Sequence, residues 1–102
     1  MKVLLLESVE EFIQALERDV EADVRRLILL LEQYGHALSI PYAKPIGRGL
    51  WELRRTGRPQ IRILYGFCGG NALLVLGVVK QRSALRREDI NMARKKLDVH
   101  CT

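Results

Sequence analysis

The sequence predicts an α+β fold in the order β-α-α-β-β-β-α, with a small, mostly antiparallel sheet and a helical hairpin packed on one face. Two amphipathic helical segments occupy the first third of the chain, and three short apolar segments with tight turns between them follow. Consecutive strands joined by tight turns form an antiparallel meander. The chain has 102 residues, of which 48% are apolar, so we expect one core and one domain over residues 1–102.

The N-terminal part is predicted to hold one strand and two helices. The apolar run at residues 2–6 is short and bounded by charge, which favours a buried strand in the centre of the sheet. Ser8 and Glu11 have the spacing of a capping box, and Asp19 is a candidate cap for the second helix. Gly35 is a suitable end for that helix, because glycine takes the left-handed conformation at little cost. The apolar stripes of the two helices are Val9, Phe12, Ile13 and Leu16, and then Val20, Val24, Leu27, Leu31 and Tyr34 with Ile28 alongside.

The C-terminal part is predicted to hold a loop, three strands and a helix. Residues 36–49 contain two prolines and two glycines, which favours a loop. The three strands are expected at Leu50–Arg55, Gln60–Phe67 and Ala72–Lys80. A last helix is expected from Arg86 to about Leu97, with Ile90, Ala93 and Leu97 facing inward.

The charges are divided unevenly along the chain. Residues 1–43 carry four basic and eight acidic side chains, whereas residues 44–102 carry thirteen basic and four acidic ones. An acidic helical half is therefore expected to support a basic sheet half. A basic face is the electrostatic footprint of a polyanion partner, usually nucleic acid, although a chance imbalance on a solvated surface is the alternative.

The two cysteines and the hydropathy pattern indicate the cellular compartment in which the protein is expected. Cys68 and Cys101 stand 33 residues apart, which matches neither a disulfide framework nor a zinc site. This usage fits a reduced intracellular compartment, and no metal or other cofactor is expected. The N-terminal apolar run is too short for a signal peptide, and no segment approaches a membrane span, so we expect a soluble, cytoplasmic protein.

Alternation along the strands predicts which side chains share a face of the sheet. Ile61, Ile63, Tyr65 and Phe67 form an apolar row that should pack under the helices. The opposite, uncovered face is expected to carry four charged side chains, with Arg82 just beyond them: Glu52, Arg54, Arg62 and Lys80. Guanidinium forks and Lys ammonium groups suit phosphate. The face is therefore a candidate for binding nucleic acid or, beside an activated 2′-hydroxyl, for cutting RNA without a metal.

Four segments of the chain resemble the RelE/ParE superfamily of toxins, and most closely its HigB-like branch of phage-derived toxins from bacterial toxin–antitoxin operons. The segments are Leu50–Arg54, Ile61–Tyr65, Leu76–Lys80 and Asp89–Ala93, and Ser8–Gly35 is similar to the family's helical hairpin. The resemblance implies a RelE-like fold and a metal-independent mRNA endoribonuclease that acts on translating ribosomes. It also implies a small antitoxin as partner, which is expected to be acidic and partly disordered. The free protein is expected to be a monomer or a weak dimer.

The resemblance assigns roles to the charged residues by position. Arg54, Arg62 and Lys80 would be the phosphate-binding and catalytic cations, although a cross-strand salt bridge to Glu52 is the alternative for Arg62. Glu52 would be either a general base toward the 2′-hydroxyl or a group that orients the arginines, and the second is favoured because cations weaken a carboxylate as a base. His100 is the C-terminal candidate for the general acid.

Further residues near this face widen the alternatives. Arg82, Lys44 and Arg48 are candidate RNA-binding residues. Gln81 stands where the family has a second Lys, and residues 84–86 lack the family's Thr-Pro motif. Both departures bear on catalytic strength. They leave open a non-catalytic relative that only binds RNA or a partner. A gyrase-directed toxin of the ParE kind, which shares the fold, is the other alternative, although the retention of Arg54, Arg62 and Lys80 on one face argues against it.

Overall fold

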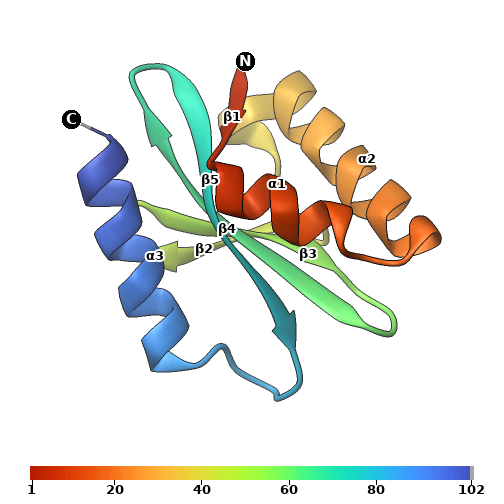
Figure 1. Ribbon diagram of the computed structural model, residues 1–102. Coiled ribbons are helices and arrows are strands. Elements are labelled where there is room, and N and C mark those ends of the chain that lie inside the picture. The colour runs from red at the N-terminus through yellow and green to blue at the C-terminus, as the bar shows by residue number, and fades with distance from the viewer. Residues whose placement is uncertain (102) are drawn as a thin grey trace.

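The computed structural model describes residues 1–101 and shows a five-stranded sheet between helices (Figure 1). The elements are β1 Val3–Leu5, α1 Glu7–Gln14, α2 Arg18–Tyr34, the 3-10 helix η1 Gly35–Ala37, β2 Ala43–Gly47, β3 Leu50–Arg55, β4 Gln60–Cys68, β5 Asn71–Lys80 and α3 Arg87–His100. The strand order in the described chain is β1-β5-β4-β3-β2, with β1 parallel to β5 and the other neighbours antiparallel. The predicted α+β class, the helical hairpin and the three-stranded meander are confirmed.

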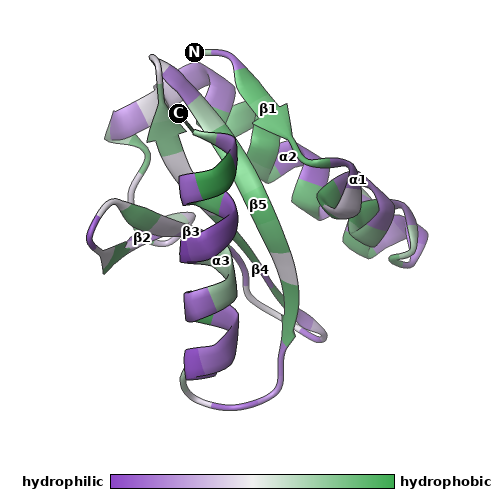
Figure 2. Ribbon diagram, turned by 60° about the vertical axis from the view of Figure 1, so that its left-hand side comes forward, coloured by the Kyte–Doolittle hydropathy of each residue, from purple (hydrophilic) through white to green (hydrophobic). Residues whose placement is uncertain are grey.

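The sheet separates two apolar cores. Helices α1 and α2 cover one face, and α3 lies across the opposite face (Figure 2). The larger core, under α1 and α2, includes Ile13, Leu31, Leu53, Ile63 and Tyr65. The smaller core, under α3, consists of Leu50, Leu64, Leu73, Val75 and Ala93. The prediction of an uncovered opposite face is wrong in part, because these apolar side chains give α3 a surface on which to pack.

The apolar stripes of the helices are buried as their periodicity predicts. Val9 and Ile13 are buried in α1, and four of the five predicted positions are buried in α2, whereas Tyr34 is 51% exposed. Ala93 is buried in α3, with Ile90 and Leu97 partly buried beside it. Burial of one stripe on each helix is what fixes these helices against the sheet.

The helix starts differ from those predicted. The N-cap position of α1 is Leu6 and that of α2 is Glu17, and neither makes a capping side-chain hydrogen bond within the described residues. Ser8 therefore lies inside α1, and Asp19 lies in the first turn of α2. The predicted end of α2 is confirmed, since Gly35 follows Tyr34 with a φ of 53°.

The strand β2 is absent from the sequence-based prediction. It lies inside the segment predicted as a loop, and it pairs with β3 so that Ala43 is opposite Leu53. Pro45 has no N–H to donate, but β2 is an edge strand, where one side of the strand needs no ladder hydrogen bonds. The two prolines and two glycines of this segment therefore do not prevent a strand.

The strand β1 lies at the other edge of the sheet, so its predicted central position is wrong. Within residues 1–101 it pairs with β5 alone, with Val3 opposite Ala72, and Leu4 is 39% exposed. Val3 and Leu5 are instead partly buried against the larger core. The apolar run is therefore explained by packing under the helices rather than by a second neighbouring strand.

A bulge in β5 sets the direction of its C-terminal half. Leu64 is opposite Leu76 and Tyr65 is opposite Leu74, so Val75 is the extra residue. Val75 and Leu76 consequently both contact the smaller core. Beyond the bulge, Gly77 faces Phe12 of α1, so that Val78 and Lys80 alternate onto the α3 side of the sheet. The bulge is what brings Lys80 to the face that carries Arg62.

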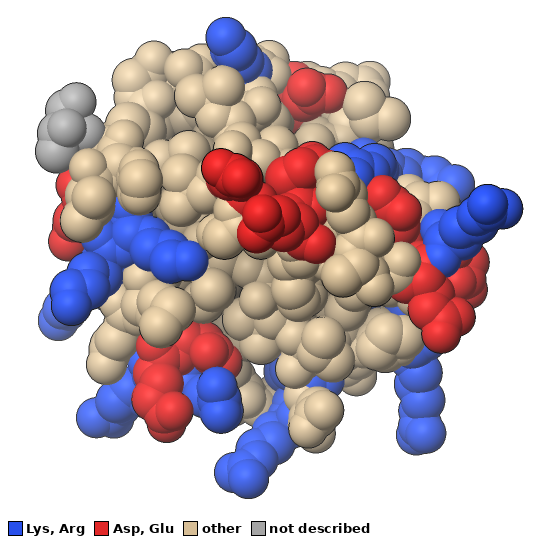
Figure 3. Space-filling view, viewed as in Figure 1, with Lys and Arg blue, Asp and Glu red and all other residues tan. Residues whose placement is uncertain are grey.

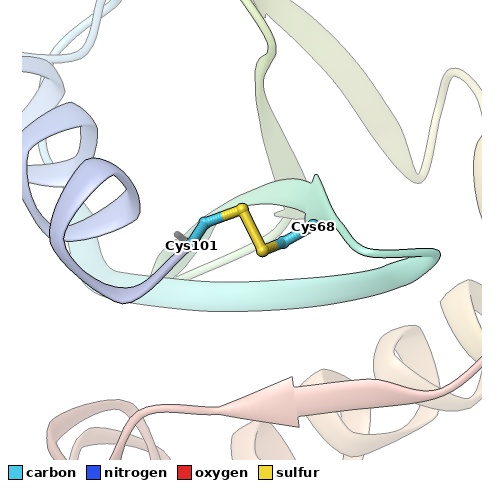
Figure 4. The surroundings of a disulfide bond; sticks show 2 residues. All are labelled: Cys68 and Cys101. Carbon is cyan, nitrogen blue, oxygen red and sulfur yellow. A yellow bond between two sulfur atoms is a disulfide. The ribbon is translucent and has the colours of Figure 1, made fainter.

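The two cysteines form a disulfide between the end of β4 and the residue after α3 (Figure 4). The Cα atoms of Cys68 and Cys101 are 5.6 Å apart. The interpretation that their spacing matches no disulfide framework is wrong, because α3 runs back along the sheet and ends beside the β4–β5 turn. Among residues 1–101, no helix has the length and apolar character needed to cross a membrane.

Candidate functional site

Cationic side chains from three strands and a loop surround one surface depression, which we call the cation depression. Its lining includes Arg54 at the end of β3, Arg62 near the start of β4, Lys80 at the end of β5 and Arg82 in the following loop. Its volume is about 410 Å³. The antiparallel register brings these strand ends together, since Arg54 is directly opposite Arg62 and Gln60 is opposite Lys80.

Glu52 lies between the two arginines. Its Oε1 is 3.6 Å from Nε of Arg54, and its Oε2 is 3.6 Å from Nε of Arg62. These distances are ion-pair contacts but too long for good hydrogen bonds. Within the described residues, Oε2 and both Nε atoms have no hydrogen-bond partner. One carboxylate thus offsets the repulsion between two facing guanidinium groups and leaves the three residues with a net positive charge.

Arg62 is held in the structure almost completely out of solvent. It is 1% exposed, and its Nη1 donates to the carbonyls of Arg55 and Ile61 at 3.0 and 3.1 Å. Its Nη2 donates to Oε1 of Gln60 at 3.2 Å. Burial lowers the pKa of the Arg62 guanidinium, which Glu52 partly counters, but an arginine stays charged in proteins. Arg62 therefore supplies a fixed positive charge at the base of the cation depression.

Lys80 is more accessible than Arg62, and Arg82 in the following loop is exposed. Burial lowers the pKa of its ammonium group, and the charges of Arg62, Arg54 and Lys44 act in the same direction, while Glu52 opposes them. A cation crowded by other cations is stabilised when an anion arrives between them. The cation depression is thus suited to a phosphate group.

The structure brings most of the predicted site residues together. Arg82 lines the cation depression, and Lys44 is opposite Glu52 on β2. Lys44, Glu52 and Lys80 also line a neighbouring depression of about 300 Å³ beside α3.

Two predicted residues lie elsewhere. Arg48 is in the β2–β3 turn, where its carbonyl accepts a hydrogen bond from Nη1 of Arg94 at 3.3 Å. His100 is the last residue of α3, next to the disulfide, at the opposite end of the sheet from Lys80 (Figure 1). The geometry therefore gives no support to His100 as a general acid for chemistry at the cation depression.

Sequence reasoning placed Gln81 near this face but missed three other neutral polar residues of the site, which are Thr56, Gln60 and Ser83. Gln60 binds Arg62 and lines the cation depression together with Thr56, Gln81 and Ser83. Gln60 and Arg62 are two residues apart on one strand, so strand alternation could have placed them on the same side. The position of Ser83 depends on the path of the loop before α3, which no sequence pattern predicted.

A group of acidic side chains lies on the helices α1 and α2, whereas Glu88, Asp89 and Asp98 lie on α3. Figure 3 shows acidic groups over α1, with most lysines and arginines toward the rim of that view. Arg25 of α2 joins this region, with Nη2 at 2.6 Å from Oε2 of Glu10 and 2.9 Å from Oε2 of Glu21. The hydrogen bond from Arg25 lowers the pKa of Glu10. The predicted division into an acidic helical part and a basic sheet part is thus visible in the structure.

Comparisons with known proteins place the chain in a family. No curated protein matches the sequence. Residues 11–98 match the model of the family described as "Phage derived protein Gp49-like (DUF891)". This match covers α2 and β2 to β5, together with the second half of α1 and α3 as far as Asp98. The family is related to the RelE toxins of toxin–antitoxin systems. The chain therefore belongs to the Gp49-like family of phage-derived proteins, a family associated with toxin–antitoxin systems.

Proposed function

We propose that this protein is a HigB-like toxin that cleaves mRNA on translating ribosomes without a metal ion. The observation that carries the proposal is the convergence of Arg54, Arg62, Lys80 and Arg82 on one depression of about 410 Å³. In a chain of a toxin–antitoxin-associated family, four cations around a depression of this size favour the phosphate backbone of RNA as ligand.

The proposed reaction is attack of an RNA 2′-hydroxyl on the adjacent phosphorus. The bond from phosphorus to the 5′-oxygen breaks, so the products are a 2′,3′-cyclic phosphate and a free 5′-hydroxyl. The 2′-hydroxyl loses its proton to solvent water, and the leaving 5′-oxygen gains one. Negative charge grows on the phosphoryl oxygens in the transition state, and Arg54 and Lys80 are positioned to stabilise it, with the fixed charge of Arg62 behind them.

Glu52 is proposed as a positioning residue. Its two oxygens each face one guanidinium Nε at 3.6 Å, and it is 6% exposed, so it holds the arginines rather than meeting the ribose. Lys80 is the proposed proton donor to the 5′-oxygen, because a lowered pKa makes its ammonium group a stronger acid. Lys80 thus replaces His100, the candidate from the sequence, as the proposed general acid.

The proposed partner is an antitoxin with acidic character. The family's association with toxin–antitoxin systems supports a cognate antitoxin. A segment rich in Asp and Glu would complement the cation depression and would keep RNA out of it by occupying the same charges.

The experiment that tests the function is induction of the protein in bacterial cells, followed by primer-extension mapping of mRNA ends. Wild type should produce cuts inside translated frames, and Lys80→Ala should reduce them about 10²-fold or more through loss of a transition-state contact. Lys2→Ala is the matched control, since Lys2 is exposed and precedes β1 at the other edge of the sheet. Equal cutting by wild type and Lys80→Ala would overturn the proposal.

Other outcomes of the same experiment identify the alternatives. Growth arrest with intact mRNA, together with inhibited supercoiling by purified gyrase, would indicate a ParE-like toxin. No arrest at all would indicate a binding protein, an alternative favoured by the near-complete burial of Arg62.

A further inference from the structure

A second depression adjoins the cation depression at the end of β3. We call it the apolar depression, because its walls include Leu27 and Leu30 of α2 and Pro41 and Tyr42 before β2. Arg54 and Thr56 line both depressions, so the end of β3 is their common wall. The volume of the apolar depression is about 240 Å³, smaller than the roughly 300–1,000 Å³ of typical small-molecule sites.

The aromatic residue of this depression is fixed beside a cation. The backbone N–H of Arg54 donates to the carbonyl of Tyr42 at 2.8 Å, which ties the two residues together across the β2–β3 edge. Tyr42 is 46% exposed. Exposed aromatic rings next to cationic grooves are stacking platforms for the bases of single-stranded nucleic acid.

The acid at the rim of the apolar depression is already neutralised. Oδ2 of Asp23 accepts from Nε of Arg55 at 3.1 Å, and Oδ1 lies 3.5 Å from Nη1 of Arg26. With Arg54 at the shared wall, the rim carries more positive than negative charge. A ligand that carries an anionic group beside a flat apolar group would complement both the positively charged rim and the apolar walls.

We propose that the apolar depression binds one nucleobase of the RNA strand, next to the phosphate held in the cation depression. This inference rests on the proposed function and adds a base-contacting subsite to it. A nucleotide joins a phosphate to a planar ring within one residue, which matches a cationic and an aromatic depression with a common wall. A protein segment fits less well, because the depression is small and offers a single exposed ring.

The experiment measures the binding of a fluorescent single-stranded RNA octamer by anisotropy. All its riboses carry 2′-O-methyl groups so that it cannot be cut. Tyr42→Ala should weaken binding about 5- to 100-fold, whereas Tyr42→Phe should keep the ring and bind like wild type. Tyr34→Ala is the matched control, because Tyr34 is a similarly exposed tyrosine at the C-terminal end of α2.

A set of octamers lacking one base at a time locates the contact. At one position of the octamer, removal of the base should weaken RNA binding by the wild-type protein. The same removal should not further weaken binding by the Tyr42→Ala variant. The salt dependence gives an independent readout: Tyr42→Ala should keep the slope of log K against log salt, whereas Lys80→Ala should reduce its magnitude by about 1. Leu30→Ala on the facing helix should produce a smaller loss, and thermal unfolding checks that each variant folds.

The outcomes separate the two proposals. Binding that depends on Lys80 but is the same in Tyr42→Ala and Tyr34→Ala would overturn the base subsite and leave the proposed function standing. A Tyr42→Ala defect that is equal for every octamer would also overturn the subsite. Unchanged RNA binding with lost binding of the cognate antitoxin would assign the apolar depression to the protein partner instead. Failure of wild type to bind any octamer would overturn the base subsite, whereas cleavage on ribosomes is decided separately by the mapping of mRNA ends.

Discussion

The two faces of the sheet bury different kinds of side chain. The larger core, under α1 and α2, is apolar apart from the hydroxyl of Tyr65. The α3 face combines the smaller core with Glu52 and Arg62, the buried charged residues of the described chain. Burying charge is costly unless it is well paired, and an apolar replacement of a buried ion pair is often neutral or stabilising. The contrast indicates that the charges on the α3 face serve a purpose other than stability.

Neighbouring residues of β3 offer the sharpest test of this contrast. Leu53 points into the larger core and is fully buried, whereas Arg54 points toward the cation depression. Leu53→Ala should lower the free energy of unfolding by about 2–5 kcal/mol, because it leaves a cavity. Arg54→Ala should lower it by less than about 1 kcal/mol, since the ion pair is long and partly exposed. Urea denaturation of both variants checks this, and equal losses would mean that the two faces are not separate.

The disulfide is expected to stabilise the α3 face. Replacing Cys68 and Cys101 by Ser, or reducing the bond, should cost about 3–4 kcal/mol, because the bond closes a loop across 33 residues of sequence separation. Thermal unfolding with and without reductant measures the effect. The double Ser variant should be insensitive to reductant, and an equal unfolding temperature of wild type in both conditions would show that the bond does not form.

Two glycines test how tightly each helix layer packs. A Cβ on Gly77 would overlap the ring of Phe12 in α1, and one on Gly66 would overlap the Leu97 side chain in α3. Gly77→Ala should cost about 1–3 kcal/mol through overpacking against a rigid ring. Gly66→Ala should cost less, because the nearest atom is at the end of a leucine side chain that can move, and the carbonyl oxygen of Gly49 is farther away at 3.1 Å. Chemical denaturation compares the pair, and a larger loss for Gly66→Ala would reverse the ranking of the two layers.

The smallest expected effect comes from the acidic side of the molecule. Arg25 holds the pKa of Glu10 below its ordinary value of 4.5, so this ion pair stabilises the fold above about pH 4.5. The contribution is lost as the pH falls through the lowered pKa. The pair is partly exposed, so it should amount to about 0.2–1 kcal/mol. Unfolding temperatures between pH 6 and 3 should fall less steeply for Glu10→Gln, and parallel curves would contradict the assignment.

The sequence predicted those features that depend on local pattern. Strand alternation placed Ile61, Ile63 and Tyr65 in the larger core and put Arg54 and Arg62 on the other side. Helical periodicity likewise identified the buried stripes of α1 and α2. These predictions succeed because side-chain direction repeats every two residues in a strand and every three or four in a helix.

The failures concern relations between distant segments. The segment β2 contains Pro45 and forms a strand because it pairs with β3. No pattern in the local sequence indicates that it has this pairing partner. The bulge at Val75 depends on the register between β4 and β5. The Cys68–Cys101 contact depends on where α3 ends, and the same packing carries His100 away from Lys80. The functions assigned to the site residues stay predictions.

The most direct test of the account is the rate of mRNA cleavage by purified protein on reconstituted translating ribosomes. The variants to compare are wild type, Arg54→Ala, Lys80→Ala and the control Lys2→Ala. The account predicts losses of about 10²-fold or more for the two site variants and an unchanged rate for Lys2→Ala, with the free energies of unfolding of all four proteins within about 1 kcal/mol of one another. Cleavage by Lys80→Ala and Arg54→Ala at the wild-type rate would contradict it.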